Sequence, residues 1–249
     1  MAPWPYPLWI AHRGAGKLAP ENTLAAFRVG AAQGYRAFEC DVKLSADGQP
    51  FLLHDDTLGR TTDGSGIAGE RTWAELSRLD AGSWHSRAFA GEAIPSFDAI
   101  ARFVLRNGYA LNIEIKPTTG AEVETGRAVA LRAAALWAEA TRPPLLSSFR
   151  PDALYAARES AAQLPRALLL STLWDGWFEI ATRLGCVAIV TEQALMDAAL
   201  VARLQSAGLR ALCYTVNDPA QAKRLLEIGI DGLITDAVEV FSPDVGASA

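Results

Sequence analysis

Residues 8–14 of the chain read Leu-Trp-Ile-Ala-His-Arg-Gly, and this stretch decides the predicted fold. The apolar run indicates a short buried β-strand, which ends in His12 and Arg13 before Gly14 breaks the pattern. Buried strands do not collect ionisable groups for stability, because unpaired charge in an apolar setting costs roughly several kcal/mol. The end of this strand is therefore a candidate functional site.

Three further apolar runs also carry ionisable residues. They are residues 37–43 with Glu39 and Asp41, residues 50–54 with His54, and residues 110–115 with Glu114 followed by Lys116. Glu39 and Asp41 stand two residues apart, so in a strand they point to the same face. Four strands that each carry charge at one end indicate one shared polar site.

The chain as a whole alternates short β-like runs with helical patterns, which is typical of an α/β domain with a parallel sheet. Strands are predicted over residues 8–12, 37–43, 50–54, 110–115, 145–149, 166–170, 187–190, 210–215 and 231–235. Helices are predicted over 22–32, with Asn22 as N-cap, and over 96–107, 121–140, 151–162, 175–184, 197–206 and 219–228. This alternation favours a (β/α)8 TIM-type barrel over a doubly wound sheet. The absence of a Gly-x-Gly-x-x-Gly motif after the first strand weakens the dinucleotide-binding alternative.

Nine predicted strands exceed the eight of a barrel, so one of them is expected to be wrong. The link between residues 43 and 50 holds no helix, and its Asp-Gly pair signals a β-hairpin. A two-residue turn there predicts that Asp41 lies opposite His54 and that Glu39 lies opposite Asp56.

Residues 57–95 fit neither a helical nor a strand period and are rich in Gly, Ser, Thr and Asp. One short helix is predicted where Thr72 and Glu75 form a capping box. A long loop at the charged end of a barrel is typical of a cover over the site. We therefore predict a single domain over residues 1–249 with an inserted cap segment at 57–95.

Composition argues against several classes of function. The net charge is −5 and no run of Lys or Arg exists, so a nucleic-acid-binding surface is not expected. No signal-peptide pattern opens the chain, and no stretch reaches the roughly 18 apolar residues of a membrane span. Cys40, Cys186 and Cys213 each lie in an apolar run and are interpreted as free core residues. We expect a cytoplasmic protein, and no pattern indicates its oligomeric state.

The three carboxylates Glu39, Asp41 and Glu114 offer hard oxygen ligands that suit Mg²⁺, Ca²⁺ or Mn²⁺ better than zinc. Like charges on one buried face need a cation between them. The alternative is that two of them are surface residues at a strand end while the third pairs with Lys116.

His12 and His54 suit a general acid and a general base, because imidazole titrates nearest neutrality. The alternative for each is a hydrogen-bonded structural histidine, and this is the interpretation we prefer for His85. Arg13 and Lys116 are cations that could bind phosphate or form plain salt bridges, in the case of Arg13 with Glu39 or Glu114.

Two aromatic residues at later strand ends, Phe149 and Tyr214, could enclose an organic group or pack in the core. Ser147 and Ser148 lack the Gly-x-Ser-x-Gly turn of serine hydrolases. Asp236 is interpreted as a cap or turn residue.

Seven motifs, in this order, resemble those of the glycerophosphodiester phosphodiesterases over nearly the whole chain, from Trp4 to about Asp236. They are His12-Arg13-Gly14, Pro20-Glu21-Asn22-Thr23, Glu39-x-Asp41, His54-Asp55, Asn112-Ile113-Glu114-Ile115-Lys116, Ser148-Phe149 and Tyr214-Thr215-Val216-Asn217. The opening Trp-Pro-Tyr-Pro is similar to that of small cytosolic bacterial members. Tyr214 departs from the family pattern, because many members carry Trp at this position, and this difference puts the fit around the alcohol group in question.

The resemblance implies a (β/α)8 barrel with an inserted cap and hydrolysis of a glycerophosphodiester to sn-glycerol 3-phosphate and an alcohol such as choline or ethanolamine. It implies that Glu39, Asp41 and Glu114 hold one divalent cation, that His12 and His54 are the acid/base pair, and that Arg13 and Lys116 bind phosphate. It favours attack by the neighbouring glycerol hydroxyl through a cyclic phosphate, whereas the sequence itself leaves direct attack by water open.

Two other functions would use a similar barrel and cleft. A metal-free phospholipase of the same barrel type would need a further cation in place of one carboxylate, and all three carboxylates are present here. A non-catalytic sensor of phosphorylated ligands would use the same cleft, but it would not need two imidazoles beside three carboxylates.

Overall fold

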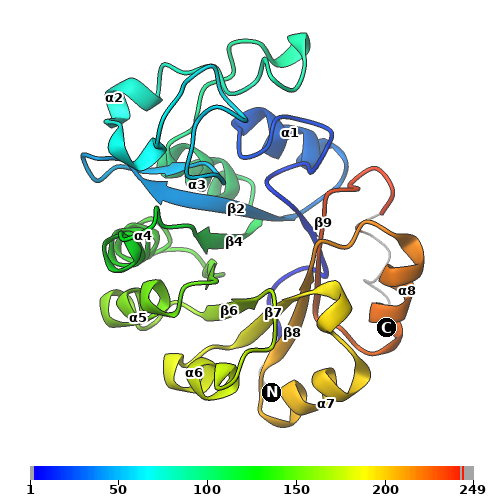
Figure 1. Ribbon diagram of the computed structural model, residues 1–249. Helices are drawn as coiled ribbons and strands as arrows, with labels where there is room; N and C mark the ends of the chain where they lie inside the picture. The colour runs from blue at the N-terminus through cyan, green and yellow to red at the C-terminus, as the bar shows by residue number, and fades with distance from the viewer. Residues whose placement is uncertain (1–2, 242, 244–249) are drawn as a thin grey trace.

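The computed structural model describes residues 3–241 and 243. Eight parallel strands form a closed barrel with helices around it (Figure 1). The strands are β1 (Trp9–Ala11), β2 (Ala37–Leu44), β4 (Ala110–Ile115), β5 (Leu145–Ser148), β6 (Arg166–Leu170), β7 (Ala188–Glu192), β8 (Arg210–Tyr214) and β9 (Gly232–Thr235). Their order is β1-β9-β8-β7-β6-β5-β4-β2, and a β1–β2 pairing closes the ring. The predicted (β/α)8 barrel is confirmed.

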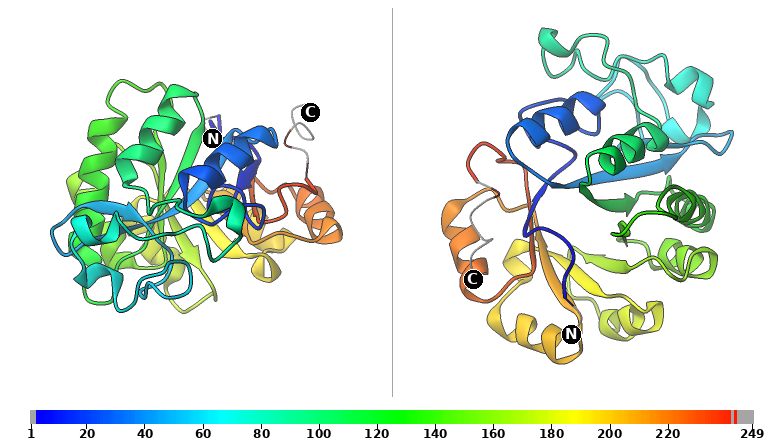
Figure 2. Two further views of the ribbon diagram at one scale, coloured as in Figure 1. Left: turned by 90° about the horizontal axis from the view of Figure 1, so that it is seen from above. Right: turned by 180° about the vertical axis from the view of Figure 1, so that it is seen from behind.

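Helices surround the barrel in the described part of the chain (Figures 1 and 2). They are α1 (Leu24–Ala32), α3 (Phe97–Arg106), α4 (Glu122–Leu136), α5 (Pro151–Ser160), α6 (Trp177–Leu184), α7 (Ala198–Ser206) and α8 (Pro219–Glu227). Among the described residues, no helix has the length and apolar character needed to cross a membrane.

The N-cap predicted for α1 is wrong by one residue. Thr23 is the cap, since its side chain accepts a hydrogen bond from Ala26 N. Asn22 has a left-handed backbone, with φ of 59°, and its amide instead bonds to Asp41 at 2.8 Å. Asn22 thus holds a side chain of the polar site, although Asn is also a residue type that commonly caps helices.

All nine predicted strands form, so the expectation that one was wrong is itself wrong. The ninth, β3 (Pro50–Leu52), lies outside the barrel and runs antiparallel to β2. Its link is a three-residue loop over 46–48, in which Gly48 has φ of +79° and donates to Ser45 O. The extra residue shifts the predicted register by one.

This shift changes which residues lie opposite one another. Lys43 pairs with Phe51, and Leu53 N donates to Asp41 O at 3.2 Å. The predicted Asp41–His54 and Glu39–Asp56 pairs are therefore not formed. His54 reaches the site from the segment after β3, outside the ladder.

The segment 57–95 lies on the side of the barrel formed by α1 and β2 (Figure 1). It contains α2 (Trp73–Leu76), with the predicted Thr72–Glu75 capping box, and two single turns of 3₁₀-helix at Ala68–Glu70 and Arg87–Phe89. It also has its own small apolar cluster, which packs on the hairpin. The members are Phe51, Leu53, Leu58, Ala68, Leu76, Ala81 and Ile94.

The interior of the barrel is apolar at the end opposite the charged residues. Four of the inward-facing residues near the strand starts are small. They are Ala37, Ala110, Ala167 and Ala188. The space they leave is filled by Trp4 and Tyr6, which pack against this layer from the N-terminal segment. The buried carboxylates Glu39, Asp41 and Glu114 lie further along their strands, toward the carboxyl ends, where barrel enzymes place their active sites.

Candidate active site

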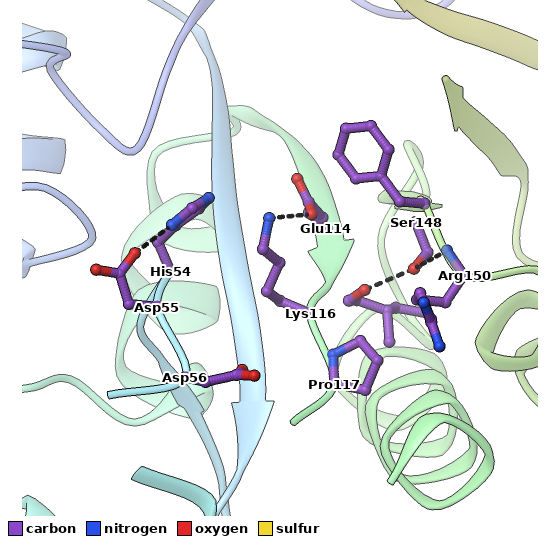
Figure 3. Close-up of a pocket in the computed structure, with 10 residues that line it drawn as sticks. His54, Asp55, Asp56, Glu114, Lys116, Pro117, Ser148 and Arg150 are labelled. Atoms are coloured by element: carbon purple, nitrogen blue, oxygen red, sulfur yellow. Dashed lines mark hydrogen bonds and ion pairs between the residues drawn. The ribbon is translucent and has the colours of Figure 1, made fainter. Parts of the chain in front are cut away.

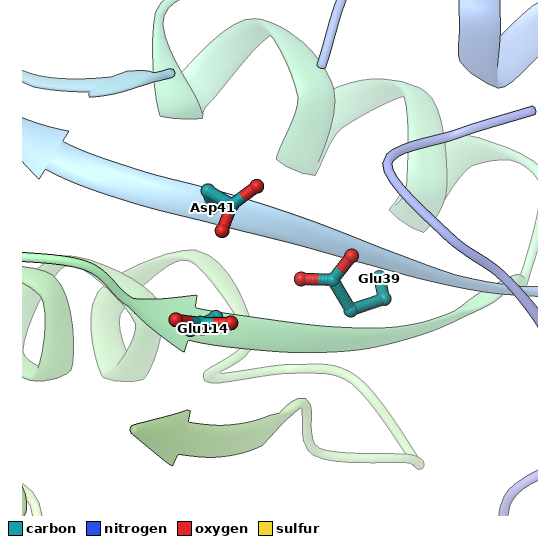
Figure 4. Close-up of side chains that lie close together, drawn as sticks. All are labelled: Glu39, Asp41 and Glu114. Carbon is teal, nitrogen blue, oxygen red and sulfur yellow. The ribbon is translucent and has the colours of Figure 1, made fainter. Parts of the chain in front are cut away.

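The three predicted metal ligands come together on two adjacent strands. In the β2–β4 register Asp41 pairs with Glu114, and Glu39 pairs with Asn112. One carboxylate oxygen from each of Glu39, Asp41 and Glu114 lies within 4.8 Å of the others (Figure 4). The i, i+2 spacing on β2 and the parallel register therefore place all three on one inner face.

Burial makes this cluster electrostatically unfavourable without a counter-ion. Glu39 and Asp41 are 3% and 1% exposed. Burial, together with Asp41 and Glu114, raises the pKa of Glu39 well above its ordinary value. Burial and Asp41 raise the pKa of Glu114 to about 7. Burial would also raise the pKa of Asp41, but Arg13 and Lys116 overcome it and hold this pKa low.

The oxygen atoms of the cluster fit a divalent cation. Glu39 Oε1, Asp41 Oδ1 and Asn112 Oδ1 are buried and have no hydrogen-bond partner in the described part of the chain. Buried polar atoms without partners are rare and costly. Hard cations take oxygen ligands of this kind, so the donor set matches Mg²⁺, Ca²⁺ or Mn²⁺.

His12 is oriented by an acidic residue that the sequence did not assign to the site. Its Nδ1 lies 2.6 Å from Asp236 Oδ1, and its Nε2 lies 3.8 Å from Glu39 Oε2. Asn217 holds Asp236 in turn through its amide nitrogen at 3.1 Å, and its amide oxygen accepts from Asp236 N at 2.8 Å. Asp236 does lie in a bend directly after β9, as interpreted from the sequence, and the β1–β9 pairing also brings its carboxylate next to His12.

His54 has a similar partner beside it in the sequence. Its Nδ1 lies 2.6 Å from Asp55 Oδ1, and Asp55 also accepts hydrogen bonds from Arg60 of the inserted segment. Burial lowers the pKa of His54 below its ordinary value. A neutral imidazole with Nδ1 protonated is therefore favoured here.

Both predicted cations lie at the cluster and are ion-paired. Arg13 contacts Glu21 at 2.8 Å and Asp41 at 3.3 Å, so its partners are not the Glu39 or Glu114 of the salt-bridge alternative. Its backbone N–H does donate to Glu39 Oε2 at 3.1 Å. Lys116 Nζ lies 2.8 Å from Glu114 Oε1 and 3.8 Å from Asp41 Oδ1.

The two aromatic residues line the site and also pack on the apolar interior. Phe149 and Tyr214 meet edge to face with ring centroids 5.6 Å apart, and the Tyr214 hydroxyl donates to Leu170 O. Burial raises the pKa of Tyr214 to about 12. Phe149 and Tyr214 line the inner cavity and also pack against the apolar interior, so each of the two alternatives drawn from the sequence describes part of their contacts.

Two cavities open at the cluster. The inner cavity, of about 290 Å³, lies over the barrel axis and is lined by His12, Arg13 and Tyr214 among others. The outer cavity, of about 390 Å³, lies between the segments that follow β3, β4 and β5 (Figure 3). His85 lines neither cavity, and its Nε2 lies 3.0 Å from Lys17 O.

Comparison with known proteins identifies the family. The sequence profile of the glycerophosphoryl diester phosphodiesterase family matches residues 12–240. A glycerophosphodiester phosphodiesterase of Caldanaerobacter subterraneus is 32% identical, over 94% of this chain and 96% of that protein.

Solved structures of similar proteins agree with this family match. A phosphodiesterase of Oleispira antarctica, in complex with the product sn-glycerol-3-phosphate, superposes with a TM-score of 0.88 at 35% identity, covering 94% of this chain and 95% of that one. A glycerophosphodiester phosphodiesterase of Agrobacterium tumefaciens gives a TM-score of 0.79 at 27% identity, covering 95% and 99%. The chain belongs to the glycerophosphoryl diester phosphodiesterase family, as an enzyme that hydrolyses glycerophosphodiesters.

Proposed function

We propose that this enzyme is a metal-dependent glycerophosphodiesterase that uses His12 and His54 as general acid and base. The products are sn-glycerol 3-phosphate and an alcohol. The observation that carries the proposal is the cluster of three buried carboxylates with unpartnered oxygen atoms, flanked by two imidazoles. The product bound in the Oleispira antarctica phosphodiesterase supports the glycerol phosphate unit.

Glu39, Asp41 and Glu114 would hold one divalent cation, Mg²⁺ or Ca²⁺, with Mn²⁺ also compatible with the donor set. Such an ion, when bound, would stabilise charge on the phosphoryl oxygens and lower the pKa of a nearby hydroxyl. Asn22 fixes the Asp41 carboxylate at 2.8 Å, which keeps one ligand in place before the substrate arrives.

The two histidines are oriented for proton transfer. A carboxylate can only accept, so Asp236 and Asp55 keep the proton of each imidazole on Nδ1. Each Nε2 is left to the substrate. One histidine takes the proton from the attacking hydroxyl, and the other donates a proton to the departing alcohol oxygen.

The remaining site residues bind the substrate. Arg13 and Lys116 neutralise charge on the phosphodiester, and their own ion pairs with Asp41 hold both cations at the cluster. Phe149 and Tyr214 enclose the organic part of the glycerol phosphate in the inner cavity.

The test is a turnover assay with controlled metal content. We expect excess chelator to abolish release of glycerol 3-phosphate, and Mg²⁺, Mn²⁺ or Ca²⁺ to restore it. Isothermal titration should show one ion bound per chain and none in Asp41→Asn. Full activity in excess chelator would refute the metal assignment, whereas ligand binding without turnover would restore the sensor alternative.

A further inference from the structure

The inner and outer cavities meet at the centre where the phosphate would bind. Four residues line both, namely His54, Glu114, Lys116 and Phe149. A diester whose phosphorus lies at these residues places one ester arm in each cavity. His12 and Arg13 line the inner cavity but not the outer one, and barrel-strand residues such as Glu39, Asn112 and Leu169 form part of its wall. The glycerol phosphate unit, which all glycerophosphodiesters share, suits this rigid inner wall. The alcohol, which differs from one substrate to another, would then occupy the outer cavity.

The outer cavity has walls from three loops (Figure 3). His54, Asp55 and Asp56 lie on one side, Lys116 and Pro117 lie in the middle, and Ser148 and Arg150 lie on the other side. Its chemistry therefore depends on which of these charges are still available to a ligand.

The acidic side of the outer cavity is already neutralised. Asp55 is paired with Arg60. Asp56 accepts from Lys43 Nζ at 2.6 Å, and the Lys43 side chain is completely buried. A buried ammonium cannot leave its carboxylate without a large desolvation cost. Neither carboxylate is left as an unpaired counter-charge for a cationic alcohol.

The aromatic ring at the outer cavity already has a cation beside it. Recognition of a quaternary ammonium group uses the open faces of aromatic rings. Phe149 is the one Phe, Tyr or Trp among the described residues that line the outer cavity, and Lys116 Nζ already lies 5.5 Å from its ring centroid. A choline group would therefore meet a fixed positive charge at the ring that should bind it.

Hydrogen-bonding groups do remain at the cavity. The Arg150 side chain is 57% exposed, and among the described residues it donates to one acceptor, Glu122 Oε1, at 2.7 Å. A guanidinium carries five N–H donors, so most of them are available. Asp56 Oδ2 receives only a long contact of 3.4 Å from Thr119 and can accept from a hydroxyl group.

We propose that the outer cavity binds the leaving alcohol and selects a hydroxyl-rich alcohol, such as glycerol or inositol, over choline. Arg150 donates to its hydroxyl oxygens and Asp56 accepts from its hydroxyl groups. This inference rests on the proposed function, because it assigns a specificity to the same reaction.

The experiment compares kcat/KM for glycerophosphoinositol, glycerophosphoglycerol and glycerophosphocholine with Mg²⁺ present. We expect the wild-type enzyme to favour both polyol diesters by about 10-fold or more. Arg150→Met should lower this ratio about 10-fold, the scale of a lost charge-assisted hydrogen bond. The matched control Arg158→Met, at an exposed position of α5, the helix that directly follows Arg150, should keep the wild-type ratio.

Product inhibition separates the two cavities. The inhibition constant of sn-glycerol 3-phosphate should be the same for wild type and Arg150→Met, since this product occupies the inner cavity. Preference for glycerophosphocholine, an equal loss on all three substrates, or weaker inhibition by glycerol 3-phosphate would overturn the inference. Absence of turnover with every diester and every divalent ion would overturn the proposed function as well.

Discussion

At the scale of single residues, the site consists of the proposed acid/base histidines and the side chains that hold them. His12 and His54 lie 42 positions apart in the sequence. Each is fixed at Nδ1 by a carboxylate 2.6 Å away. Orientation of this kind matters because proton transfer requires a defined ring nitrogen at the reacting oxygen.

Replacing either imidazole should remove one proton transfer. We expect His12→Ala and His54→Ala each to lower kcat by about 100-fold or more, the usual scale for general acid/base groups. Steady-state turnover of a glycerophosphodiester measures this, with metal binding by titration as the control for an intact cluster. A near-normal rate in either variant would remove its assigned role.

Asp236 should act through His12. We expect Asp236→Asn to lower kcat about 10-fold or more with little change in KM, because an amide can stabilise the wrong tautomer of the imidazole. Asp236→Glu should recover part of the loss. In a His12→Ala background Asp236→Asn should have no further effect on kcat, whereas an additive loss would show a separate structural role.

Residue types at strand ends were sufficient to predict which side chains gather at one site but not the partners that hold them. Glu39, Asp41 and Glu114 stand out because carboxylates interrupt apolar strands. Asp236 and Asn22 do not stand out, since Asp and Asn are common at turns and caps. Their roles depend on contacts with His12 and Asp41 across the closed barrel, which a local pattern does not contain.

At the scale of elements, the β2–β3 hairpin shows how a strand can be predicted without its register. The Asp-Gly pair at 47–48 is compatible with a two-residue turn and with a three-residue loop. The chain adopts the longer loop, in which Ser45 N also donates to Gln49 O at 3.1 Å. Because side chains alternate along a strand, this single residue exchanges the two faces of β3.

The inserted segment contacts both the site and α1. Arg60 bridges Glu21 and Asp55, and Glu92 accepts from Ala25 N at the start of α1. The barrel has a separate and larger apolar core. We therefore expect deletion of most of 57–95 to leave a folded barrel with impaired substrate use, measured by circular dichroism and by kcat/KM.

Two results would show whether the segment 57–95 is a cover over the site or a part of the core. Arg60→Gln is the matched point variant, and it should reproduce part of the loss in kcat/KM because it frees the Asp55 carboxylate from its cation. Global unfolding of the deletion variant would show that the segment 57–95 is an integral part of the core.

At the scale of the whole molecule, the parallel pairing of β2 with β4 brings three buried carboxylates together, at a cost in free energy that a bound cation would offset. Glu114 has its pKa raised to about 7, whereas a glutamate in the unfolded chain titrates near about 4.3. Between these pH values Glu114 holds its proton in the folded metal-free protein and loses it in the unfolded chain. The contribution of Glu114 to the free energy of unfolding therefore falls as pH rises through this range.

This predicts a pH-dependent difference between the wild-type protein and Glu114→Gln without metal. The variant cannot ionise at this position, so it should gain stability relative to wild type as pH rises from about 4.5 to 7, measured by denaturant unfolding. Adding a divalent ion at about 100 times its dissociation constant should stabilise the wild type by about 2.7 kcal/mol. The same ion should stabilise Glu114→Gln much less. Equal pH profiles for the two metal-free proteins, or equal stabilisation by metal, would mean that these carboxylates do not share one ion.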